Sequence, residues 1–183
     1  TYAPCSAAQL TGVGYDYWAL GHVHTPREVQ TAPHIVFSGN IQGRDIGETG
    51  PRGCYVVTVD RARRPTPWFI ALDDVRWERL EVAVESFAPA TVDDVVDGVV
   101  TAIEKSRPGD DRLLACRVVL QGQTPLHRQL FSRRDSLRDE IAATAASLLE
   151  RVCLEKVEVK TSLPDSTPRP PAEDAGRAIS LLA

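Results

Sequence analysis

The chain has 183 residues, 43% hydrophobic and 25% charged, a balance typical of a folded globular protein rather than a disordered one. Its formal net charge of -4 at pH 7 argues against nucleic-acid binding through bulk positive charge. No apolar run has the length of a membrane span and no leader pattern is recognisable, so nothing argues for secretion, and we expect no membrane partner. The absence of methionine and the start at Thr1 suggest the back part of a longer protein.

The first third of the chain is rich in short strands. Residues 15–21, 34–40 and 68–72 are aromatic or apolar runs that predict strands, and residues 53–60 form a continuous β-branched run typical of a strand covered on both faces. Residues 39–53 contain five glycines and predict a loop with unusual backbone conformations or close approaches.

The middle of the chain alternates strands and helices. Strict alternation over residues 79–85 predicts a half-buried strand, and residues 112–122 and 153–160 predict two more. Two amphipathic helices are expected between them, with apolar stripes formed by Val92, Val95, Val96, Val99 and Ile103 in the first and by Leu137, Ile141, Ala145, Leu148 and Val152 in the second. The expected class is α+β, with a β-α-β-α-β unit over residues 76–162 and a proline-rich linker or tail over residues 163–183.

The four cysteines are widely separated and form no C-x-x-C pair. Cys54, Cys116 and Cys153 lie in or beside apolar strand-like segments, so we expect buried free thiols. Such thiols are common in cytoplasmic proteins, and we therefore expect a cytoplasmic location.

His22 and His24 stand one residue apart at the end of the first apolar run. In an extended segment such side chains point to the same side, with Cα atoms roughly 6 to 7 Å apart. They suit one metal ion, or one ion each of a pair. The pattern alone leaves open metal ligands and two polar residues where a strand meets a loop. A zinc module is disfavoured because no suitably spaced cysteine pair accompanies them.

Three segments together carry a family resemblance: "YAPCS" at residues 2–6, "DYWALGHVHTP" at 16–26 and "SGNIQGRDIGETGPRGCYVV" at 38–57. They resemble the SbcD-type DNA repair exonucleases of the calcineurin-like metallophosphoesterases. The resemblance implies that residues 1–75 are the C-terminal strands of a metallophosphoesterase β-sandwich and that residues 76–162 are a small α/β capping domain. It also implies two divalent ions, usually Mn²⁺, with His22 and His24 as ligands, one to each ion.

The same resemblance implies hydrolysis of phosphodiester bonds in DNA, a homodimer, and an SMC-like coiled-coil ATPase as partner. The sequence departs from the family pattern because the D-x-H, G-D-x-x-D and G-N-H-[ED] motifs are absent. We therefore expect this chain to be inactive by itself. Two alternatives are a calcineurin-like phosphoesterase for small phosphodiesters or nucleotides, and a non-catalytic module that binds nucleic acid or acts as a scaffold.

The remaining candidate residues each have two interpretations. Asn40 and Arg44 either face the metal site and substrate phosphate, or belong to a structural turn with Arg44 solvated. Arg128, Arg133 and Arg134 either contact DNA phosphates or form a solvated face, and Arg138 belongs to the same cluster.

Seven further residues are interpreted as structural or solvated. Asp45 and Glu48 are interpreted as loop residues in solvent rather than metal carboxylates, and His34 and His127 as a strand-edge and a helix-start residue. Tyr15, Tyr17 and Trp18 are interpreted as core rather than as a platform for base stacking.

Overall fold

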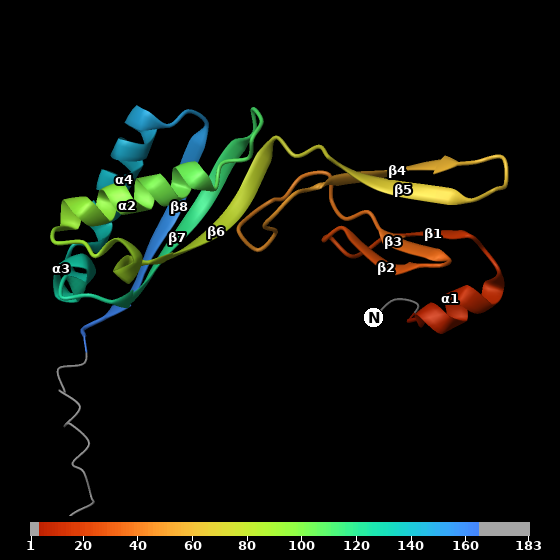
Figure 1. Ribbon diagram of the computed structural model, residues 1–183, viewed down its shortest axis with the longest axis horizontal. Helices are drawn as coiled ribbons and strands as arrows, with labels where there is room; N and C mark the ends of the chain where they lie inside the picture. Colours follow the sequence, from red (N-terminus) through yellow and green to blue (C-terminus); the bar gives the residue numbers. More distant parts are fainter. Residues whose placement is uncertain (1–3, 165–183) are drawn as a thin grey trace, which may run out of the picture.

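The computed structural model of the chain describes residues 4–164. The ribbon has two lobes that meet at the turn between strands β5 and β6 (Figure 1), which we name the strand lobe (residues 4–74) and the cap lobe (residues 75–164). Apart from residues 163 and 164, the tail expected over 163–183 lies outside the described residues. Within the described range, no helix combines the length and hydropathy that crossing a bilayer requires.

The strand lobe holds two small sheets and one short helix. Strand β3 is the centre of the first sheet, parallel to β1 and antiparallel to β2, and β4 and β5 form an antiparallel hairpin. The bounds are α1 Ala7–Val13, β1 Tyr17–Leu20, β2 Arg27–Thr31, β3 His34–Phe37, β4 Gly53–Val59 and β5 Pro65–Ala71. Neither α1 nor β2 was expected. Helix α1 is fixed by a capping box between Ser6 and Gln9, which satisfies amide groups at its start.

The prediction that β4 is covered on both faces is wrong. Val56 on β4 and Trp68 and Ile70 on β5 are 36%, 42% and 38% exposed. The β-branched run does form a strand, but its only sheet neighbour among the described strands is the other arm of the hairpin. A two-stranded hairpin does not by itself cover both of its faces.

The cap lobe confirms the β-α-β-α-β order. Three parallel strands run in the order β6-β7-β8, with bounds β6 Val75–Ala83, β7 Leu113–Gln123 and β8 Val152–Ser162. The helices are α2 Val92–Lys105, α3 His127–Ser132 and α4 Arg134–Leu148, with a 3-10 turn, η1, at Val84–Phe87. Strand β6 begins four residues before the predicted position, and α3 was not expected. Helices and strands are both present, as the α+β class requires.

The cap lobe also holds most of the hydrophobic core. Among described residues, the buried hydrophobic side chains outside it are Ile35 and Val36, both on β3. The core joins one face of the sheet to α2 and α4 and includes the predicted stripe of α2. The stripe predicted for the second helix is wrong at its end: Leu148 is 69% exposed, and Val152 already belongs to β8.

The prediction of buried thiols holds at one cysteine. Cys116 on β7 is fully buried, Cys54 is partly exposed and Cys153 is exposed. The reason at Cys153 is strand alternation, since the next residue, Leu154, faces the core and Cys153 takes the opposite face.

Candidate metal centre

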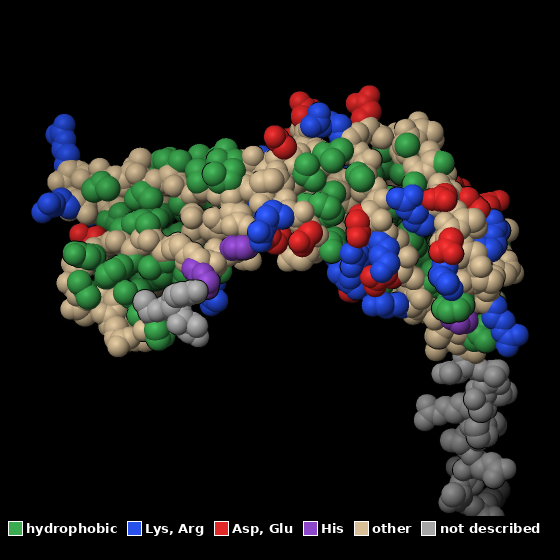
Figure 2. Space-filling view, turned by 180° about the vertical axis from the view of Figure 1, so that it is seen from behind, with side chains coloured by type: hydrophobic (Ala, Val, Ile, Leu, Met, Phe, Trp, Pro, Cys, Tyr) green, Lys and Arg blue, Asp and Glu red, His purple; other side chains and the backbone are tan. Residues whose placement is uncertain are grey.

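Parallel pairing of β1 and β3 brings the two segments of interest together. In a parallel pair the carboxyl ends of both strands lie at the same edge of the sheet. The loop after β1, which we name the histidine loop (residues 21–26), therefore leaves the sheet beside the glycine-rich loop after β3 (residues 38–52). Histidine side chains of the strand lobe lie on its concave side, near basic and acidic groups (Figure 2).

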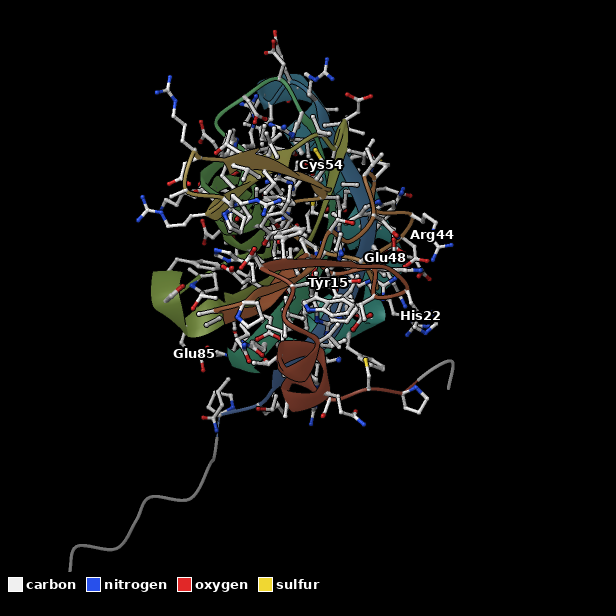
Figure 3. The ribbon with its side chains drawn as sticks, turned by 90° about the vertical axis from the view of Figure 1, so that its right-hand side faces the viewer. Tyr15, His22, Arg44, Glu48, Cys54 and Glu85 are labelled. Atoms are coloured by element: carbon white, nitrogen blue, oxygen red, sulfur yellow. The ribbon has the colours of Figure 1, made fainter. Side chains whose placement is uncertain are left out.

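The histidine loop is not the regular extended segment that we expected. His22 has a φ of 77°, a left-handed conformation uncommon for a residue with a Cβ. The same-side placement of His22 and His24 that holds for a strand therefore does not apply. Figure 3 shows His22 at the same edge of the molecule as Arg44 and Glu48.

The two loops are locked together through their backbones. The Asn40 amide donates to the carbonyl of His24 at 2.9 Å. Gly39 has a φ of 75°, and a Cβ there would lie 2.7 Å from the His24 carbonyl oxygen and the Pro26 nitrogen. Glycine is therefore required where the loops touch, as the glycine-rich sequence predicted.

Glu48 organises the side chains of the site. Its Oε1 lies 2.7 Å from His24 Nδ1 and 2.9 Å from Arg44 Nη2, and its Oε2 accepts from the Arg44 amide at 3.0 Å. The Asn40 side-chain amide lies 3.3 Å from both carboxylate oxygens. Arg44 Nη2 is also 3.1 Å from His24 Nδ1. A carboxylate only accepts hydrogen bonds, so the shorter contact to Glu48 favours a proton on His24 Nδ1. With that proton in place, Nδ1 and the Arg44 guanidinium are both donors and do not bond each other.

These contacts overturn the interpretation of Glu48 as a solvated loop residue. Its side chain is only 12% exposed, against 49% for His24 and 68% for Arg44. Hydrogen bonds from the Arg44 guanidinium, and next from His24, hold the pKa of Glu48 well below its usual range. Glu48 is therefore a carboxylate at neutral pH and favours a donating Nδ1–H on His24.

The donor set fits a divalent metal only in part. A histidine that donates Nδ1–H to a carboxylate presents Nε2 as a metal ligand, an arrangement common in metal sites. His22 supplies a second imidazole in the same loop. Within residues 4–164, however, no group of three or more His, Cys, Asp or Glu side chains is placed to hold a metal ion. His22 and His24 would thus be part of a site completed by other ligands.

The structure does not bring the predicted cap arginines to these loops. Arg128 lies on α3, and Arg133 and Arg134 lie where α4 begins, at the end of the cap lobe remote from the glycine-rich loop (Figure 1). Arg133 pairs with Glu140 at 2.7 Å. Arg134 stacks over the ring of Phe131, with 5.4 Å between its Cζ and the ring centroid.

The predicted aromatic strand contributes little to the core. Tyr15 is 60% exposed, and Tyr17 and Trp18 on β1 are partly buried. The rings of Tyr15 and Trp18 lie against each other with centroids 5.0 Å apart.

Sequence reasoning missed Arg52 and the role of Glu48. Arg52 is 3% exposed and hydrogen-bonds to both loops. A lone arginine between proline and glycine has no periodicity that marks it as buried. For Glu48 a signal existed, because it is one of two acidic residues in a loop that follows a histidine pair.

Comparison with known proteins gives two matches. Residues 77–162, from the third residue of β6 to the last of β8, match the family model described as the middle domain of the metallophosphoesterase YhaO. The chain is 35% identical over 127 residues to the uncharacterized metallophosphoesterase YhaO of Bacillus subtilis (strain 168), an alignment covering 68% of this chain. The alignment spans 30% of that relative's length. These matches support a metallophosphoesterase family for the chain.

Proposed function

We propose that the chain supplies the histidine loop and the cap of a divalent-metal-dependent phosphodiesterase that cuts DNA. The observation that carries the proposal is His24, half exposed and held through Nδ1 by Glu48, which leaves Nε2 as the nitrogen available to a metal. Arg44 stands beside it with an exposed guanidinium suited to a phosphate.

In this proposal His22 and His24 are metal ligands, one to each of two ions, and Mn²⁺ is the expected metal. Bound ions would polarise the phosphate and supply a hydroxide nucleophile. The chain's own residues have separate tasks: Glu48 orients His24, and Arg44 binds the substrate phosphate. Because further ligands are required, the isolated chain is expected to be inactive.

DNA as substrate is supported by the resemblance of both loops to DNA repair exonucleases, and by the open position of His24 and Arg44, which suits a polymer. A homodimer and an SMC-like ATPase partner belong to the same proposal. The competing function is that of a phosphoesterase for small phosphodiesters. A nucleotide phosphodiester hydrolysed faster than linear duplex DNA would favour that function.

The chemistry is tested with the complete translation product of the gene, on linear duplex DNA with Mn²⁺. His24→Ala is expected to lower the rate at least about 100-fold, in the range seen when a catalytic group is removed. His34→Ala is the matched control, because His34 pairs with Glu28 outside the candidate site. Equal digestion by the His24→Ala variant and the wild type would remove His24 from the mechanism.

DNA binding by the cap is tested on this chain by fluorescence anisotropy at several salt concentrations. The double variant Arg128→Ala/Arg134→Ala is expected to weaken binding of every duplex sequence and to lower the salt slope by about 2, one for each phosphate that is no longer neutralised. Arg64→Ala is the control, an exposed arginine on the β4–β5 turn. A salt slope unchanged from the wild type would show that these arginines form a solvated face.

A further inference from the structure

Arg52, at the end of the glycine-rich loop, is a buried cation that hydrogen-bonds to backbone oxygens of two loops. Its guanidinium donates to the carbonyls of His24 at 2.6 Å, Thr49 at 2.8 Å and Glu48 at 3.3 Å, and to Thr25 Oγ1 at 3.4 Å. Buried arginines usually pair with carboxylates. Here the planar fork holds two loop backbones at fixed separation.

The two backbones that Arg52 joins belong to the pair that forms the candidate site. The side chains of His24 and Glu48 meet at 2.7 Å, and Arg52 bonds the carbonyl of each residue. The His24 carbonyl also accepts from the Asn40 amide. One guanidinium therefore bonds both of the backbones that carry the imidazole and the carboxylate.

The same residue also bonds the turn between the two lobes. The backbone carbonyl of Arg52 accepts from the amides of Leu72 at 2.8 Å and Asp73 at 3.2 Å, in the turn that leads into β6. The buried carboxylate of Asp73 contacts two cap-lobe arginines, Arg76 Nη2 at 2.9 Å and Arg112 Nε at 3.2 Å. A chain of direct contacts thus runs from Arg76 and Arg112 through Asp73 and Arg52 to His24.

A second connection joins the cap lobe to the glycine-rich loop. Trp77 Nε1 on β6 donates to the carbonyl of Gly43 at 3.1 Å, and Gln42 Nε2 donates to the carbonyl of Val75 at 2.7 Å. Gly43 immediately precedes Arg44, so the first residues of the cap also fix the backbone that carries Arg44 beside Glu48.

We propose that Arg52 is a positioning residue that holds His24 against Glu48 and ties this geometry to the turn that leads into β6 of the cap lobe. Its importance for catalysis rests on the proposed function. The positioning itself is a property of the chain without metal, so it is measured separately.

The test reads the tautomer of the His24 imidazole by long-range ¹H–¹⁵N correlation NMR at a fixed pH where the ring is neutral. The wild type is expected to show mainly the Nδ1–H form that donates to Glu48. Arg52→Lys, whose single ammonium does not reach both loops in the same way, is expected to show a lower Nδ1–H population. Arg52→Met is expected to show the lowest, a mixture of both tautomers. The control is Arg64→Met, because Arg64 pairs with Asp60 at the surface.

Wild-type tautomer populations in folded Arg52→Met would overturn the proposal. If Arg52→Met does not fold, the test uses Arg52→Lys instead. Wild-type tautomer populations of His24 in Arg52→Lys would then overturn the proposal. The two proposals can fail separately. If His24→Ala digests DNA at the wild-type rate, the proposed function is rejected. If the Nδ1–H population of His24 still falls from wild type to Arg52→Lys to Arg52→Met, the positioning role of Arg52 is retained.

The link to the cap has its own variant. Arg112→Met removes a contact to Asp73 and a hydrogen bond to the carbonyl of Ala71 at the end of β5, without touching either loop. We expect Arg112→Met to shift the His24 ring resonances in the same direction as Arg52→Lys does, but by a smaller amount. An unchanged ring would restrict the role of Arg52 to the strand lobe and overturn the coupling.

Discussion

Glu48 shows how much of the candidate site depends on one carboxylate. It accepts hydrogen bonds from His24, Arg44 and Asn40, three residues that come from two loops. Such a partner fixes which imidazole nitrogen carries the proton and which is available to a metal.

Replacing Glu48 by glutamine is therefore expected to weaken Mn²⁺ binding about 10- to 100-fold, the usual effect of removing a carboxylate behind a metal-binding histidine. The measurement is Mn²⁺-induced broadening of the His24 ring signals as a function of metal concentration. Asp45→Asn is the matched control in the same loop, where Asp45 bonds the nearby backbone. Equal broadening in Glu48→Gln and wild type would contradict this role.

The four thiols are expected to differ in reactivity. Burial raises the pKa of the Cys116 thiol to about 12, so at a pH of about 8 it stays protonated and enclosed. Cys5 and Cys153 are exposed. Alkylation with iodoacetamide, followed by mass spectrometry, should label these two first and Cys116 only after unfolding. Labelling of Cys116 as fast as Cys153 in the folded chain would contradict the packing of β7.

Among the elements, helix α2 begins with a capping box, as α1 does. Thr91 Oγ1 accepts from the Asp94 amide at 3.2 Å, and the Asp94 carboxylate accepts from the Thr91 amide at 2.8 Å. Thr91→Ala should lower the free energy of unfolding by about 1 kcal/mol. Urea denaturation measures this, with Thr101→Ala, an exposed change within the same helix, as control. A decrease no larger than that of Thr101→Ala would show that the cap contributes nothing.

The turn between β5 and β6 should make stability depend on pH through Asp73. Burial raises the pKa of Asp73, but hydrogen bonds and charge from Arg76 outweigh it, and the net pKa lies below the ordinary value. A lowered pKa in the folded state adds stability above the ordinary aspartate pKa of about 3.9, which is lost as pH falls through the folded value.

Asp73→Asn is accordingly expected to cost about 1 to 3 kcal/mol at pH 7, with the difference from wild type shrinking below about pH 4. Urea denaturation at several pH values measures both. Asp74→Asn is the neighbouring exposed control. A difference between Asp73→Asn and wild type that stays constant down to about pH 2 would contradict the ionised, buried state of Asp73.

Across the whole molecule, the two lobes differ in how much apolar surface they bury. The cap lobe encloses a continuous core between one face of its sheet and two helices. In the described part of the strand lobe, by contrast, the buried hydrophobic residues are Ile35 and Val36 alone. The free energy needed to open a segment locally is higher where more apolar contacts are buried.

Amide hydrogen exchange should therefore be slowest in β7, α2 and α4 and clearly faster in β2, β4 and β5. Native-state exchange followed by NMR or mass spectrometry compares them directly within one sample. Equal protection in β4 and β7 would show that the lobes unfold as one unit.

Local patterns determined most of the cap. Helical spacing of valines defined α2, and alternation or continuous apolar runs identified β6, β7 and β8, because these elements pack against one core with a regular period. The end of α4 was misjudged, since the helical spacing of apolar residues continues to Val152, which is already the first residue of β8.

For the candidate site, the sequence indicated several of the residues, and the tertiary structure decided how they pair. Residue types and their order were enough to single out His22, His24, Asn40 and Arg44. The pairing of His24 with Glu48 and the burial of Arg52 were decided only when parallel pairing of β1 and β3 brought two loops to one edge of a sheet. The physical reason is that a periodic apolar face is visible in neighbouring residues, whereas a hydrogen bond between residues 24 and 48 exists only after the chain has folded back on itself.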